Sequence, residues 1–86
     1  MWFGKAADHG NAAAEAYLGA MYRNGLGVAQ DDVQAYKWYN LAAMHFPESA
    51  TSSRDGAIMN REAIAARMTA AQIADAQKLA QEWKPK

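Results

Sequence analysis

Apolar side chains recur along this chain at intervals of three and four residues, the spacing that places them on one face of an α-helix. Between residues 12 and 24 this series contains Leu18, Met21 and Tyr22. The predicted full helices cover 12–24, 32–45, 54–67 and 70–83, and residues 1–9 form the end of a further helix. The expected fold class is therefore all-α, with about four full helices and a partial N-terminal one.

The same spacing predicts which side chains face the interior. The expected inward positions are Ala14, Tyr17, Leu18, Met21 and Tyr22 in the first full helix and Ala35, Trp38, Tyr39, Ala42 and Ala43 in the second. In the third they are Ile58, Ala65 and Met68, with Ile64 beside that face, and in the last they are Ile73, Ala76, Leu79, Ala80 and Trp83. Ala is the commonest residue and β-branched residues are scarce, which favours closely packed helices over a sheet.

Glycines and capping residues mark the ends of these helices. Gly10 and Gly25 can adopt the left-handed conformation that closes a helix C-terminus, and Gly25-Leu26-Gly27-Val28 forms a turn with two permissive positions. The chain leaves the helix 32–45 at Phe46-Pro47, because a residue before proline is pushed away from helical dihedrals. The expected N-caps are Asn11, Asp31 or Asp32, Ser52 or Ser53, and Thr69, which forms a capping box with Gln72.

Gly19 lies inside the helix 12–24, where a glycine costs about 1 kcal/mol relative to alanine. We expect this cost to be offset by the close approach of a neighbouring backbone. Gly19 is therefore a predicted site of tight packing.

Two segments of the chain repeat each other 36 positions apart. Trp2-Phe3-Gly4-Lys5-Ala6-Ala7-Asp8-His9 corresponds to Trp38-Tyr39-Asn40-Leu41-Ala42-Ala43-Met44-His45, with Trp on Trp, Ala-Ala on Ala-Ala and His on His. A period of about 20–50 residues is the sequence signature of solenoids and arrays. Such proteins mostly bind other proteins. Because residue 1 falls inside a repeat, we expect an incomplete array.

Charge and composition exclude several function classes. Nine Lys and Arg balance nine Asp and Glu, so the chain lacks the basic surface that nucleic-acid binding requires. No apolar run approaches the ~20 residues of a transmembrane helix, and the first residues lack a signal-peptide pattern. The absence of cysteine excludes disulfides and thiolate metal sites and leaves the localisation open.

Candidate reactive side chains have simpler structural explanations. His9 and His45 lie near helix C-termini, where a cation is favoured, and zinc needs three or four converging ligands. Capping explains Asp31-Asp32 better than acid–base chemistry does, and no motif places a base beside the hydroxyls of 49–53. Gly25-Leu26-Gly27 follows a helix rather than a strand, which excludes a phosphate loop. We predict no enzymatic activity, no metal and no cofactor.

The stretch 11–46 closely resembles the Sel-one-like repeat, a relative of the tetratricopeptide repeat. The residues that carry the resemblance are glycines, aromatics, alanines and turn residues at fixed spacing: Ala14, Leu18, Gly19, Met21, Tyr22, Gly25, Gly27, Val28, Asp31, Ala35, Trp38, Tyr39, Ala42 and Ala43. Residues 2–10 match the end of a preceding unit. Residues 47–86 look like the helical pair that closes such arrays in bacterial members.

The resemblance implies an α-solenoid of antiparallel helix pairs stacked into a right-handed superhelix. Residues 1–10 would end a truncated repeat, 11–46 would be one complete repeat, and 47–86 would be a C-terminal capping pair with Trp83 pinning its last helix. In the complete repeat, Gly19 and Ala42 would let the two helices approach, and Tyr22 and Trp38 would fill the space between them.

Three positions depart from the repeat pattern. Ala29 replaces a frequent proline, Leu41 stands where the preceding copy has Lys5, and Phe46 stands where it has Gly10. The last change ends the repeat pattern and supports a cap over 47–86.

The function implied by the resemblance is a non-catalytic protein–protein interaction module that binds a peptide or partner helix along the first helix of a repeat. The outward polar residues expected to contact the partner are Asn11, Glu15, Arg23 and Asn24. One alternative is a purely structural cap of a longer array. Another is a β-lactam-binding, hydrolase-like member, although the chain lacks that group's cysteines and the S-x-x-K spacing. Trp2 and Phe3 would lack part of their packing, so we also expect self-association through the N-terminal edge.

Overall fold

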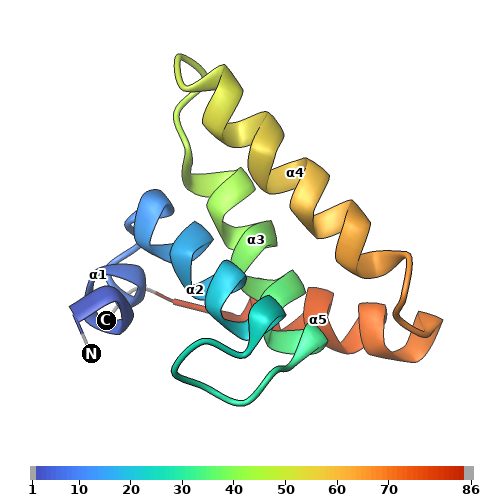
Figure 1. Cartoon of the computed structure of the whole chain (residues 1–86). Coiled ribbons are helices and arrows are strands. Elements are labelled where there is room, and N and C mark those ends of the chain that lie inside the picture. The colour runs from blue at the N-terminus through green and yellow to red at the C-terminus, as the bar shows by residue number, and fades with distance from the viewer. Residues whose placement is uncertain (1, 85–86) are drawn as a thin grey trace.

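Five helices, with no strand, make up the part of the chain that the structure describes (Figure 1). The structure is a computed structural model that describes residues 2–84, with only the backbone described for residues 2–4. The helices are α1 (Trp2–Asp8), α2 (Ala12–Asn24), α3 (Asp32–His45), α4 (Thr51–Ala65) and α5 (Ala70–Glu82). The predicted all-α class is confirmed, and the packing of the helices agrees with a helical repeat solenoid. Trp2 and Phe3, on which the expected self-association rests, have side chains outside the described residues.

The turns around α2 form as their glycines and caps predict. Gly10, Gly25 and Gly27 adopt φ values of 85°, 68° and 74°, the left-handed region that glycine reaches without steric cost. The Asn11 side chain accepts the Ala14 N–H at 2.9 Å. Capping of this kind satisfies an N–H group that the helix itself leaves unpaired.

Asp31, rather than Asp32, caps α3, because its carboxylate accepts the Gln34 N–H at 3.1 Å. Asp32 instead binds the Arg67 guanidinium, with Arg67 Nη2 at 2.6 Å and Nε at 3.1 Å from the carboxylate oxygens. This pair connects the start of α3 to the turn before α5.

Helix α4 starts three residues before the predicted position. The Ala50 N–H donates to the Pro47 carbonyl at 2.9 Å, so the chain is already turned when α4 begins at Thr51. The expected caps Ser52 and Ser53 lie inside the first turn, and no side chain caps this helix. The prediction failed because the turn is made by backbone bonds after the proline rather than by a capping hydroxyl.

The other end of α4 is also shorter than predicted. Helix α4 ends at Ala65 because the chain tightens there, with the Arg67 N–H donating to the Ile64 carbonyl at 3.1 Å. The capping box of α5 is confirmed. Thr69 Oγ1 accepts the Gln72 N–H at 3.1 Å, and Gln72 Oε1 accepts the Thr69 N–H at 2.9 Å.

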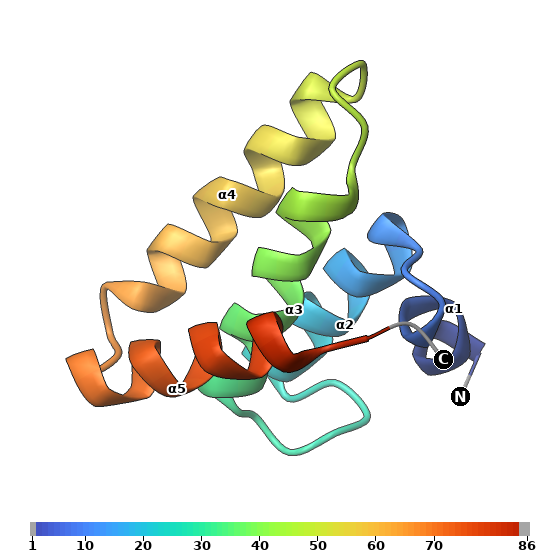
Figure 2. The same ribbon diagram turned by 180° about the vertical axis from the view of Figure 1, so that it is seen from behind.

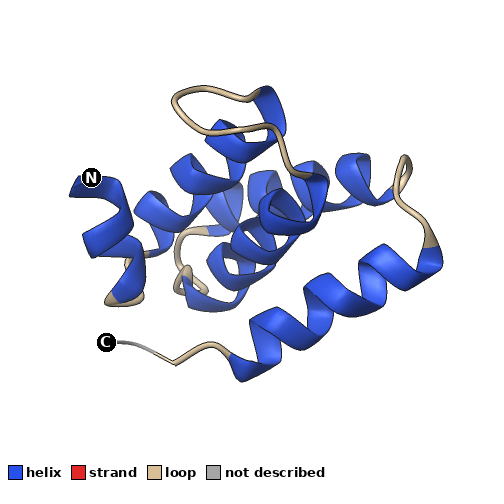
Figure 3. Ribbon diagram, turned by 90° about the horizontal axis from the view of Figure 1, so that it is seen from below, coloured by secondary structure: helices blue, strands red, loops and turns tan. Residues whose placement is uncertain are grey.

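Helix α3 is the centre of the fold, because α2, α4 and α5 all pack against it (Figure 2). Helices α4 and α5 diverge from the turn that joins them, and α5 runs along one side of the bundle (Figure 3). The last residues of α5 thereby return to α1. Trp83 Cη2 lies 3.6 Å from the position that a Cβ atom on Gly10 would occupy.

The core consists of two clusters that share α3. One contains Ala35, Tyr36, Tyr39, Ala42, Ala43, Ala57, Ile64 and Ala76, and the other contains Ala7, Ala14, Leu18, Trp38, Leu41 and Ala80. Tyr22 packs against both clusters from α2. The predicted inner face of α3 is buried, but so are Tyr36 and Leu41, because α3 is covered on several sides rather than on one.

Leu41 explains one departure from the repeat pattern. Its side chain is 1% exposed and lies in the same cluster as Ala80 of α5, whereas its counterpart in the preceding copy, Lys5, is exposed. The apolar leucine therefore stands at the buried position, and the charged lysine stands at the exposed one.

Two positions predicted to face inward are open to solvent. Tyr17 is 58% exposed and Leu79 is 39% exposed. Helix α5 buries only a narrow stripe that includes Ala76 and Ala80, so Leu79 falls beside the contact rather than in it. Tyr17 lies where α2 faces a groove.

Gly19 contacts an aromatic ring, not the backbone that we expected. A Cβ atom placed on Gly19 would lie 2.8 Å from Cδ2 of Tyr39, closer than any side chain tolerates without movement. The glycine therefore admits the Tyr39 ring from α3 against the axis of α2.

Candidate functional site: a groove between α2 and α4

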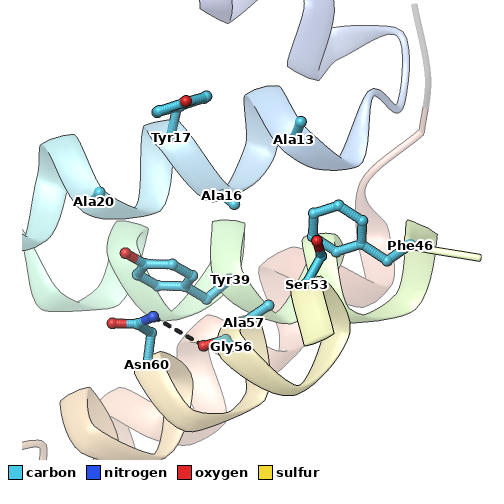
Figure 4. A pocket seen from close by; sticks show the side chains of 10 residues that line it. All are labelled: Ala13, Ala16, Tyr17, Ala20, Tyr39, Phe46, Ser53, Gly56, Ala57 and Asn60. Atoms are coloured by element: carbon cyan, nitrogen blue, oxygen red, sulfur yellow. Dashed lines mark hydrogen bonds between the residues drawn. The ribbon is translucent and has the colours of Figure 1, made fainter. Parts of the chain in front are cut away.

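A groove of about 360 Å³ lies between α2 and α4 (Figure 4). Tyr39 of α3 and Phe46, the residue after α3, close its base. One wall is formed by residues of α2 and the other by residues of α4: Ala13, Ala16, Tyr17 and Ala20, and Ser53, Gly56, Ala57 and Asn60. No charged side chain is among the residues that line it.

Small side chains at helical spacing create the groove. Ala13, Ala16 and Ala20 recur along α2 at intervals of three and four, so they share one face. On the opposite wall, a Cβ atom on Gly56 would meet nothing within 4 Å. The two helices are both held on α3, and their short side chains leave the space between them unfilled.

One hydrogen bond joins α2 to α4, and a second, within α4, orients its acceptor. Arg23 Nη1 donates to Asn60 Oδ1 at 2.6 Å, and Asn60 Nδ2 donates to the Gly56 carbonyl at 2.8 Å. Burial raises the pKa of the Tyr39 hydroxyl above its ordinary value, and the nearby Arg23 charge offsets part of that rise. The phenol at the base therefore stays neutral at physiological pH.

The residues predicted to contact a partner differ in their surroundings and do not form one exposed surface. Asn11 caps α2, Asn24 is exposed with its Nδ2 donating to the Ala20 carbonyl at 3.0 Å, and Arg23 forms the bridge to α4. The expectation that Glu15 faces outward is wrong, because its side chain is completely buried. Its spacing to Leu18 and Tyr22, three and seven residues, already placed it on the inner face of α2.

Sequence reasoning missed the residues that line the groove. The alanines and Gly56 carry no polar signal, and their role depends on α2 and α4 lying opposite each other on α3. The sequence does show that Ala13, Ala16, Tyr17 and Ala20 share one face of α2, but the exposure of Tyr17 appears only in the structure.

Glu15 is held by a histidine. His45 Nδ1 and Glu15 Oε1 are 2.7 Å apart, and the His45 ring lies 5.1 Å from the ring of Trp83, centroid to centroid. Burial raises the pKa of Glu15 above its ordinary value of 4.5, while the hydrogen bond and charge of His45 and the charge of Lys37 offset part of that rise.

Glu15→Gln is expected to flatten the pH dependence of stability. Since its folded pKa lies above the unfolded value of 4.5, the folded chain keeps a proton that the unfolded chain has lost. The stability from this proton is fully present below pH 4.5 and is lost as the pH rises through the folded pKa. Unfolding midpoints of wild type and Glu15→Gln, measured from below pH 4.5 to neutral pH, test this. Parallel pH profiles would contradict it.

Metal and membrane functions gain no support from the described residues. Within 2–84, no group of three or more His, Asp or Glu side chains is arranged to hold a metal ion. His9 is exposed and His45 pairs with Glu15. Among the helices described, none is long and apolar enough to span a bilayer.

The repeat pattern and the helix pair agree with a known family. The family model of the Sel1 repeat matches residues 1–11 and 12–45. Comparison with the curated proteins and with the solved structures gives no match. Sel1 repeats are generally non-catalytic scaffold units that mediate protein–protein interaction. The matched residues cover more than half of the chain, which therefore belongs to the Sel1 repeat family.

Proposed function

We propose that the chain is a protein-interaction module that binds the apolar face of a partner helix in the groove between α2 and α4. The observation that carries this proposal is an open, uncharged groove between two helices of a scaffold repeat. Apolar concave surfaces with few polar groups are common binding sites, and a helix in a groove is a recurrent recognition mode.

Backbone chemistry favours a helix over an extended peptide. Every backbone N–H and C=O that enters an apolar site needs a hydrogen-bond partner. Both walls are helices whose backbone groups bond internally. The polar side chains that line the groove are only Tyr39, Ser53 and Asn60, and Asn60 already bonds Arg23 Nη1 and the Gly56 carbonyl, so few partners are left for an extended backbone. A helix satisfies its own backbone, whereas an extended strand would leave several groups unpaired.

The dimensions of the wall set the length of the contact. From Ala13 to Ala20 the helix axis rises about 10 Å, at 1.5 Å per residue. The partner therefore contributes about two helical turns, with apolar residues at i, i+3, i+4 and i+7. Because no charge lines the groove, the affinity should depend little on salt.

A synthetic amphipathic helix provides the direct test. The probe carries leucines at i, i+3, i+4 and i+7 and alternating lysine and glutamate elsewhere, and its control has a central proline that breaks the helix. We expect chemical-shift changes at the amides of Ala13, Ala16 and Ala57 with the first peptide only. The proposal fails if these amides do not respond, or if the proline peptide moves them equally.

Gly56→Leu is expected to weaken binding of this probe at least about ten-fold, because the new side chain occupies the groove, where an added Cβ atom meets nothing within 4 Å. The fold should be kept, since leucine favours a helix over glycine. Ala74→Leu, at an exposed position of α5 outside the groove, is the matched control and should bind like wild type. Fluorescence anisotropy of the labelled peptide measures both affinities. If they are equal, the peptide binds outside the groove.

We also propose, as a second role, that residues 47–86 cap the repeat. The supporting observation is that Leu41 is buried in one cluster with Ala80 of α5, at the position where the preceding copy carries an exposed lysine. End units of a stacked array need a cover over their apolar face. The stability lost in Leu41→Ala measures how much this cover contributes.

A further inference from the structure

Arg23 is a half-buried cation that forms no ion pair with any of the described residues, whereas Arg61 and Arg67 each pair with a carboxylate. The hydrogen bond that its guanidinium makes within the described chain runs from Nη1 to Asn60 Oδ1 at 2.6 Å. Arginine is always charged in proteins, and withdrawing such a charge from water costs free energy unless an anion compensates. The fold therefore holds a partly desolvated cation that an anion would stabilise.

The hydrogen bond to Asn60 orients the guanidinium of Arg23 and leaves its Nε and Nη2 donors available. These two groups lie on one edge of the planar guanidinium, and a carboxylate binds such an edge through both of its oxygens. Arg67 shows this arrangement in the same fold, with Nε at 3.1 Å and Nη2 at 2.6 Å from the two oxygens of Asp32. The available edge of Arg23 therefore fits an aspartate or glutamate side chain.

Arg23 lies at one end of the groove between α2 and α4. It is three residues beyond the lining residue Ala20, about 4.5 Å further along α2, and it is bonded to Asn60 of the opposite wall. Figure 4 shows the Tyr39 hydroxyl and the Asn60 amide at this end of the groove, whereas Phe46 lies at the other. The charge of Arg23 also acts on the Tyr39 hydroxyl, because it offsets part of the rise in the pKa of that group. One end of the groove is therefore apolar, and the other is polar with a positive charge beside it.

We propose that the groove selects partner helices that carry an aspartate or glutamate one turn beyond their apolar stripe, and that Arg23 binds this carboxylate. The inference rests on the proposed function, because the apolar stripe has to lie in the groove before the acidic side chain can reach Arg23. Charge complementarity favours such a partner over a neutral or basic one, since its carboxylate supplies the anion that Arg23 lacks among the described residues.

Two matched peptides test this preference. In a helix with apolar residues at i, i+3, i+4 and i+7, the positions that extend the same face by one turn are i−4 and i+11. The leucine probe is lengthened to include both positions, which are either both glutamate or both glutamine. Because the substituted residue stands at both ends, the result does not depend on the direction in which the helix lies in the groove.

Fluorescence anisotropy of the labelled peptides measures their affinities at low and at high salt. At low salt we expect wild type to bind the glutamate peptide about ten-fold more tightly than the glutamine peptide, because a charge-assisted hydrogen bond is stronger than a neutral one. The preference should shrink as salt screens the pair. Arg23→Gln should remove the preference and still bind the glutamine peptide, since the apolar contacts of the groove are unchanged.

Arg54→Gln is the matched control, because it removes the same charge from an exposed arginine of α4 that does not line this groove. It should keep the wild-type preference. Each protein is measured with the same two peptides, so a difference in helicity between the free peptides cancels in the comparison. If both peptides bind wild type equally, or if Arg23→Gln keeps the preference, the inference is overturned and the proposed function stands. If neither peptide shifts the amides of the groove, both are overturned.

Discussion

Leu41→Ala is expected to lower the free energy of unfolding by about 2–5 kcal/mol, because it deletes a buried leucine and leaves a cavity. Leu41 is 1% exposed and lies where α3 is covered by side chains of α2 and α5. A chain of 86 residues has a net stability of only about 5–10 kcal/mol. The substitution should therefore remove a large part of it and shift the urea midpoint strongly.

Leu79→Ala is the matched control for this experiment. Leu79 is 39% exposed on α5, so the same chemical change should cost well under half as much. Urea unfolding of both variants, followed by circular dichroism, gives the comparison. Equal losses would mean that α5 does not cover Leu41 in solution.

Gly19→Leu is expected to destabilise the fold by about 1–3 kcal/mol through overpacking. Even a single added carbon would lie 2.8 Å from the Tyr39 ring, which is fixed in the core of α3. The ring cannot withdraw without disturbing the first cluster. Thermal and urea unfolding measure the loss.

A substitution at Gly56 is the control, because it is expected to raise the stability of the fold rather than lower it. Gly56 too is a mid-helix glycine, but an added Cβ atom meets nothing within 4 Å, so Gly56→Ala should stabilise the fold by about 0.5–1 kcal/mol through helix propensity. If Gly19→Leu proved neutral, α2 and α3 would have to lie further apart than the structure shows.

Local features of the sequence predicted most of the fold. The positions of α2, α3 and α5, the left-handed glycines and the Thr69–Gln72 capping box each depend on residues within one turn of each other. All the residues that produce such a signal lie within a few positions of each other in the sequence. The start of α4 was missed since Ala50 has no capping side chain to announce it.

The groove and the buried pair could not be predicted in this way. Glu15 and His45 are 30 residues apart, and a buried carboxylate is unusual enough that its outward orientation was the natural expectation. Leu41 is buried in one cluster with residues of α2 and with Ala80 of α5, and α5 begins nearly thirty residues after it. These features depend on which helices meet across α3, and no local pattern contains that information.

The Tyr39 ring forms the base of the groove while also lying against Gly19, so one side of the ring packs on α2 and the other faces the proposed binding groove. A change at Gly19 would tilt this ring and reshape the surface offered to a partner, although no partner could touch residue 19. In the proposed function, buried residues below the groove therefore also determine which partners fit it, although they contact none of them.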